Sequence, residues 1–121
     1  MPRTFEYKDP SRIELIQQLE DTAKKEQSGL WASVAKKLGR NRRNRSEVNL
    51  YRINKYTTKG DIIVVPGKVL GDGVIEHQVD VAAYRFTSSA AKKISDAGGK
   101  IFKITDLVKS NPKGSRIKII G

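Results

Sequence analysis

The chain has 121 residues, a common length for one domain, and with 37% hydrophobic residues it can form one modest core. It contains 24 Lys and Arg against 13 Asp and Glu, a formal net charge of +11, and no cysteine. The lack of cysteine excludes a disulfide framework, a cysteine zinc site and a thiol nucleophile. Because excess charge repels itself in a compact chain, we expect a polyanionic partner, with nucleic acid preferred over an anionic membrane.

The opening residues, MPRTFEYKDP, contain no apolar segment of the kind that a signal peptide requires. No run in the sequence approaches the roughly 18 apolar residues that span a bilayer. We therefore expect a soluble, intracellular protein without a membrane partner.

Two helices are predicted near the N-terminus. The capping-box pair Ser11 and Glu14 favours a helix start, and apolar residues then recur at helical spacing over 10–26. After a break, a second apolar stripe includes Trp31 and ends before Gly39, a favoured C-terminal cap. Its place on the stripe makes Trp31 a core residue rather than a base-stacking one.

The next part of the chain concentrates the positive charge. Residues 36–59 hold nine basic residues and one acid, whereas residues 1–35 hold five basic and six acidic residues. Between residues 40 and 45 every basic residue is arginine, whose guanidinium binds phosphate through two hydrogen bonds and stacks on bases. Tyr51 and Tyr56 are candidates for stacking on unpaired bases, or they are ordinary surface residues.

The arginine-rich run is an internal connector rather than a tail. It leaves the helix that ends at Gly39 and leads to Val48, Leu50 and Ile53, which we expect to point inward. The candidate RNA-binding residues are Lys36, Lys37, Arg40, Asn41, Arg42, Arg43, Asn44, Arg45, Arg52, Lys55, Lys59, Gly67 and Lys68.

Beyond residue 60, strands alternate with helices. Strands are predicted over 61–65, 78–86, 101–102 and 116–120, and helices over 87–97 and 105–108. Pro66-Gly67 is expected to end the first strand in a turn, and Gly71-Asp72-Gly73 to form a second turn. The glycines of that second turn also admit a close approach of RNA. The order predicts an α/β fold with short strands, preceded by two helices.

Catalytic chemistry is not predicted. His77 is the single histidine and is interpreted as a surface or turn residue. Gly67-Lys68 resembles the end of a phosphate-binding loop, but no glycine lies five residues before it and Val69 replaces the Ser or Thr. An RNA-processing enzyme would need clustered acids, and Glu47 is the only acid in the basic segment. We expect no enzyme activity, no metal, no cofactor and no small-molecule substrate.

Four blocks carry a family resemblance: RRNRSEVNLYRINKYT, IIVVPGKVLGDGVI, VAAYRFTSSAAKKISDAGGK and NPKGSRIKIIG. Together they resemble the archaeal and eukaryotic eighteen-e family of large-subunit ribosomal proteins, which is related to the bacterial fifteen family. The resemblance begins near residue 10, is most specific at VPGKVLG, and favours the compact archaeal form. Carried over by position, the family's Arg/Asn-rich segment falls on residues 40–45 and its glycine-lysine block on Gly67 and Lys68.

The resemblance implies an irregular, layered ββα-type α/β fold and a structural, non-enzymatic protein of the cytoplasmic ribosome. Its implied partners are large-subunit ribosomal RNA and neighbouring ribosomal proteins. We therefore expect one RNA-binding domain over residues 1–121. Within it, residues 1–9 are predicted to be a flexible N-terminal extension, and residues 39–47 are the basic connector.

One alternative is a DNA-binding chromatin or regulatory protein. The two N-terminal helices, joined at Ser28-Gly29, are spaced as in a helix-turn-helix. The second helix uses Trp31, Val34 and Leu38 for the core, however, and this leaves few side chains to read bases.

Replacing Arg42, Arg43 and Arg45 by alanine tests the connector. Each neutralised phosphate contributes roughly 0.7 to 0.9 to the log–log salt dependence of RNA binding, so the slope should flatten by about two to three units. Affinity for a transcribed large-subunit RNA, measured across a range of salt concentrations, gives the slope. An unchanged slope would remove these arginines from the interface.

Overall fold

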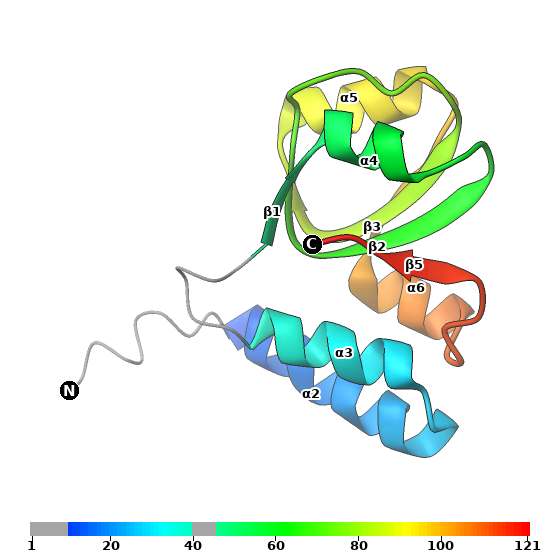
Figure 1. The fold of residues 1–121 in the computed structure, drawn as a ribbon. Helices are drawn as coiled ribbons and strands as arrows, with labels where there is room; N and C mark the ends of the chain where they lie inside the picture. Colours follow the sequence, from blue (N-terminus) through cyan, green and yellow to red (C-terminus); the bar gives the residue numbers. More distant parts are fainter. Residues whose placement is uncertain (1–9, 40–45) are drawn as a thin grey trace.

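The computed structural model describes residues 10–39 and 46–121 of the chain (Figure 1). Its helices are α2 (Pro10–Glu26), α3 (Gly29–Leu38), α4 (Leu50–Tyr56), α5 (Ser88–Asp96) and α6 (Ile104–Ser110). Its strands are β1 (Ser46–Asn49), β2 (Asp61–Leu70), β3 (Val79–Phe86), β4 (Ile101–Lys103) and β5 (Ile117–Ile119). The predicted irregular α/β fold, with two helices ahead of the sheet, is confirmed.

The strands form a parallel sheet with β2 at its centre. β3 pairs with one edge of β2, and β4 pairs with the far edge of β3. The other edge of β2 receives two strands in succession, with β5 beside residues 62–64 and β1 beside residues 67–70. The beginning and the end of the sheet region therefore meet on one edge of a single strand.

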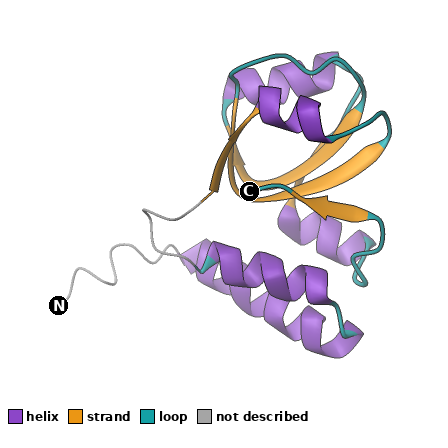
Figure 2. Ribbon diagram, viewed as in Figure 1, coloured by secondary structure: helices purple, strands orange, loops and turns teal. Residues whose placement is uncertain are grey.

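Helices cover both faces of the sheet (Figure 2). One core packs α4 and α5 on the sheet, and a second core packs α2, α3 and α6 on the opposite face. Because successive strand residues point to opposite faces, Ile63 and Val65 join the first core while Val64 joins the second. Burial on both faces explains why β2 reads as a continuous run of β-branched residues.

The turn expected at Pro66-Gly67 is wrong, because β2 continues through both residues. Pairing with β3 shifts its register between Val65 and Lys68. On the opposite edge, β5 pairs as far as Val64, and β1 begins opposite Gly67. Pro66 thus occupies a gap in both ladders, where the N–H that proline lacks is not needed for pairing.

Both N-terminal helices form over the predicted residues. Ser28 Oγ caps α3 by accepting a hydrogen bond from the Trp31 N–H at 3.4 Å. Gly39 follows α3 in a right-handed conformation, with φ −77°, rather than the left-handed one common for a glycine cap. Trp31 is fully buried and donates its Nε1–H to the Asn111 carbonyl at 3.1 Å, which confirms its core role. The predicted capping contact of Ser11 lies outside the described side chains.

The elements predicted after residue 78 are confirmed as β3, α5, β4, α6 and β5. Thr87 caps α5 as expected, because its Oγ1 accepts a hydrogen bond from the Ala90 N–H at 3.2 Å. Two elements, β1 and α4, were not predicted. They occupy residues 46–56, where apolar and basic residues mix without a clear period over such short lengths.

The glycine turn at residues 71–73 lies directly against the first turn of α4. The Tyr51 N–H donates to the Asp72 carbonyl at 3.1 Å. A Cβ atom built on Gly73 would stand 2.6 Å from the Tyr51 nitrogen. The missing side chain of Gly73 therefore makes room for α4, and a close approach of RNA to this turn stays a prediction.

We expect Gly73→Ala to destabilise the protein more than Gly98→Ala. Both glycines have positive φ, +98° and +89°, so alanine costs about 1 to 2 kcal/mol at each position. Only at Gly73 does the added Cβ also meet backbone, since nothing lies within 4 Å of it at Gly98. Urea unfolding of both variants measures the difference. Equal losses would contradict the tight seating of α4 on the turn.

Candidate nucleic-acid interface

The outer side of α4 carries basic and aromatic side chains together. Four exposed residues form this surface, called here the α4 face: Tyr51, Arg52, Lys55 and Tyr56. Lys55 lies four residues after Tyr51, and Tyr56 lies four residues after Arg52. All four side chains therefore lie within an arc of roughly 140° around the helix axis. Leu50 and Ile53 are fully buried on the other side. The helix contains no acid, so its exposed charge is entirely positive.

The two tyrosines of the α4 face remain open to solvent, at 59% exposure for Tyr51 and 57% for Tyr56. The Lys55 ammonium lies 5.5 Å from the centre of the Tyr56 ring, within cation–π range. Exposed rings beside cations are the usual components of surfaces that stack unpaired bases and bind phosphates. Stacking by either tyrosine stays a prediction.

Hydrogen bonds to the loop between β2 and β3 hold α4 in place. The Asn54 Nδ2 donates to Glu76 Oε1 at 2.7 Å, and the Glu76 N–H donates to Asn54 Oδ1 at 2.9 Å. Lys93 of α5 steadies the same loop by donating to the carbonyls of Gly71 at 2.8 Å and Gly73 at 3.0 Å. The loop in turn fixes the orientation of the α4 face.

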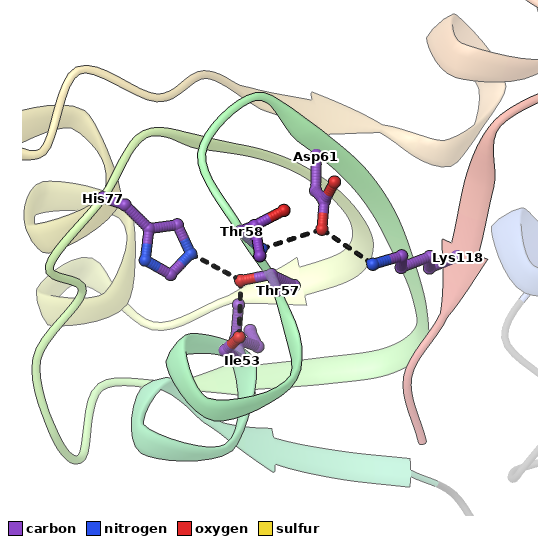
Figure 3. A network of polar contacts seen from close by, with 6 residues as sticks. All are labelled: Ile53, Thr57, Thr58, Asp61, His77 and Lys118. Carbon is purple, nitrogen blue, oxygen red and sulfur yellow. Dashed lines mark hydrogen bonds and ion pairs between the residues drawn. The ribbon is translucent and has the colours of Figure 1, made fainter.

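His77 joins this set of contacts (Figure 3). The Thr57 Oγ1 lies 2.7 Å from the Ile53 carbonyl oxygen and 2.7 Å from His77 Nε2. Because the carbonyl can only accept, the hydroxyl donates to Ile53 and accepts from His77, which places a proton on Nε2. His77, half-buried in the loop, therefore secures the C-terminal end of α4.

An ion pair links the start of β2 to β5 (Figure 3). The Lys118 Nζ lies 2.9 Å from Asp61 Oδ2, and the same oxygen accepts from the Thr58 N–H at 2.8 Å. The Lys118 hydrogen bond, followed by that of Thr58, holds the pKa of the Asp61 carboxyl below its ordinary value. Lys118 was not among the predicted site residues, since its position depends on strand pairing across the chain.

The structure places seven of the predicted site residues: Lys36, Lys37, Arg52, Lys55, Lys59, Gly67 and Lys68. The Lys37 Nζ donates to the Gly121 backbone oxygen at 2.9 Å, which ties the end of α3 to the segment after β5. Gly67 is buried inside β2, so its predicted contact with RNA rests on its backbone and stays a prediction. The other five are exposed. The six candidates within residues 40–45 lie outside the described residues.

Both anchors of the connector are defined by contacts in the fold. Before it, the Arg12 Nη1 donates to the Leu38 carbonyl at 2.6 Å in a buried contact at the end of α3. At its other end, Ser46 pairs with Gly67 and Glu47 with Lys68 along β1 and β2. The end of the connector therefore lies beside the glycine-lysine block, although Ser46 and Gly67 are 21 positions apart in the sequence.

Across residues 10–39 and 46–121, no helix is long and apolar enough to cross a membrane. The described residues also contain no cluster of three or more His, Asp or Glu side chains suited to a metal ion.

Known proteins resemble this chain over nearly its whole length. The model of the family described as ribosomal protein 60S L18 and 50S L18e matches residues 8–120. A large ribosomal subunit protein eL18 of Methanoregula boonei is 44% identical over 120 residues, or 99% of each chain. The eL18 protein of Methanospirillum hungatei is 41% identical over the same shares. That of Archaeoglobus fulgidus is 43% identical over 112 residues, covering 93% of this chain and 96% of the relative.

Lys118→Met should raise the pKa of the Asp61 carboxyl toward its ordinary value, because the ammonium is the main cause of its lowering. The stabilisation that accompanies a lowered carboxyl pKa is present above the unfolded value and is lost as pH falls through the folded value. The stability of the variant should therefore depend less on pH through Asp61 in this acidic window, and the part that comes from the Thr58 hydrogen bond should remain. Carboxyl NMR titration measures the pKa directly.

Lys109→Met is the matched control, since it removes one exposed lysine that does not bond to Asp61. The Asp61 pKa should not move in this variant. An equal rise in both variants would mean that overall charge, rather than the ion pair, sets the pKa.

Proposed function

We propose that this chain, which belongs to the family of ribosomal proteins 60S L18 and 50S L18e, binds folded large-subunit ribosomal RNA through its Arg- and Lys-rich surface. The protein is a structural constituent of the large ribosomal subunit rather than an enzyme, and it acts in the cytoplasmic ribosome. Its partners there are ribosomal RNA and neighbouring ribosomal proteins.

One observation carries the RNA-binding proposal: the α4 face presents Arg52 and Lys55 beside two exposed tyrosines, with no acid on the helix. The α4 face follows β1, in the stretch of residues 36–59 that holds nine basic residues and one acid. Cations that dock on phosphates release condensed counterions, which supplies binding free energy without reading sequence. Recognition of folded RNA by shape and phosphate positions follows from this chemistry.

The rigidity of α4 supports the same proposal. Asn54 donates to Glu76, and Thr57 donates to the Ile53 carbonyl while accepting from His77. These bonds orient the helix without using the charged side chains of the α4 face. A surface already held in its binding geometry loses less conformational entropy when a partner docks. Arg52 and Lys55 therefore approach phosphates from a fixed platform.

The proposed interface also includes the connector, whose arginines follow the buried Arg12 contact and precede β1. We treat residues 1–121 as one RNA-binding domain, because both cores pack against the same sheet. The exposed acids of α2, Glu14, Glu20 and Asp21, suit a basic protein neighbour better than RNA.

Two double variants of equal net charge test the α4 face. Arg52→Gln with Lys55→Gln should flatten the log–log salt slope for a transcribed large-subunit RNA by about 1.4 to 1.8 units, given roughly 0.7 to 0.9 per phosphate. Lys24→Gln with Lys25→Gln, which removes two exposed cations of α2, should leave the slope unchanged. If both pairs flatten the slope equally, net charge alone drives binding and the proposed surface is wrong.

The same assay separates RNA from DNA binding. We expect the wild-type chain to bind the ribosomal RNA more tightly than duplex DNA of matched length at equal salt. Equal or tighter binding of DNA would favour the helix-turn-helix alternative.

A further inference from the structure

A groove of about 570 Å³ separates α4 from the end of the chain. Its lining comes from α4 and from the segment that contains β5: Arg52, Tyr56, Lys118, Ile119, Ile120 and Gly121. The volume falls within the range of about 300 to 1,000 Å³ typical of small-molecule sites, which is enough for one nucleotide. Among the described residues no Asp or Glu lines the groove, and Arg52 and Lys118 supply two cations, so it favours an anionic occupant.

One part of the lining suits the flat face of a base. Tyr56 is 57% exposed, and the partly buried Ile119 adds apolar surface from β5 on the opposite side, whereas Ile120 is only 7% exposed. Lys55 lies over the Tyr56 ring, but a ring has two faces, and a base can stack on the one that the ammonium leaves open. Aromatic rings bind bases in this way without regard to base identity.

Another part of the lining suits a phosphate. Arg52 is exposed, and within the described part of the chain it makes no hydrogen bond or ion pair. Lys118 is engaged by Asp61, yet its side chain is 55% exposed, and an ammonium has three donors. Because Asp61 offsets part of the Lys118 charge, Arg52 is the stronger phosphate ligand of the two.

We propose that this groove binds one unpaired nucleotide of RNA, with the base stacked on Tyr56 and its phosphate held by Arg52 with support from Lys118. The proposal rests on the RNA-binding function proposed above and adds a single-stranded element to it. It also distinguishes the two tyrosines of the α4 face. Tyr51 is equally exposed on the same helix but does not line the groove.

The test uses the full chain and two short RNA probes, an oligoadenylate and an oligomer of equal length that lacks the bases. Both carry the same phosphates, so only stacking separates them. The wild-type chain should bind the oligoadenylate more tightly, and Tyr56→Leu should weaken that binding by about 5- to 150-fold, the range for loss of one stacked base. Tyr56→Leu should bind the two probes equally. NMR titration supplies both the affinity and the shift of the Tyr56 ring.

Three further variants sharpen the test. Tyr56→Phe keeps the ring and should retain the preference for the oligoadenylate. Tyr51→Leu removes an equally exposed ring of the α4 face that does not line the groove, so it should weaken binding of the oligoadenylate less than Tyr56→Leu does. Arg52→Gln should weaken the binding of both probes by a similar factor, because it removes a phosphate ligand. This variant supplies the test of the groove if Tyr56→Leu fails to fold.

Three results would overturn the groove assignment: equal binding of both probes by the wild-type chain, equal losses in Tyr51→Leu and Tyr56→Leu, or no binding of either probe. The last result would leave the groove to a segment of a neighbouring protein. If the wild-type chain still binds transcribed large-subunit RNA in that case, the proposed function holds and only the groove proposal fails. If it binds neither, both fail.

Discussion

Burial of β2 on both faces and along both edges is the constraint on which the other elements depend. Its residues alternate between the two cores, so helices on opposite sides of the sheet share one strand as their support. Its edges accept β3 on one side and both β5 and β1 on the other. Since β1 contains the last two residues of the connector and precedes α4, the register between β1 and β2 sets where the end of the connector meets the sheet.

Most of the contacts that hold the candidate interface in place do not involve its cationic side chains. The fold therefore leaves positive charge on the surface. The backbone amide and the carboxylate of Glu76, the Thr57 hydroxyl, one asparagine and one histidine hold α4 against its loop. Lys93 and Lys37 donate hydrogen bonds to backbone carbonyls, and these bonds stabilise the loop and the end of α3. Arg52 and Lys55 are left on the surface, so the charge that destabilises the free chain is the charge that a polyanion can use.

Sequence reasoning located the helices that have long apolar stripes and the strands that have β-branched runs. It failed where tertiary context decides the outcome. Pro66 looks like a strand end unless one knows that both neighbouring ladders are interrupted beside it. The seven residues of α4 are too few to show a helical period, and their helicity depends on the partners that Asn54 and Thr57 find beyond residue 70. Lys118 and the groove depend on an edge pairing that no local pattern reveals.

The pairing of β5 beside residues 62–64 has a consequence for the order of folding during synthesis. The ribosome that makes this chain releases β2 long before β5, so that edge of β2 waits unpaired while the intervening 50 or so residues emerge. Contacts between such distant segments form slowly, because loop closure must precede any gain from pairing. During that interval Ile62 and Val64 border an open strand edge, the kind of surface that recruits foreign strands. Early capture by a chaperone would shield this edge until the last strand arrives.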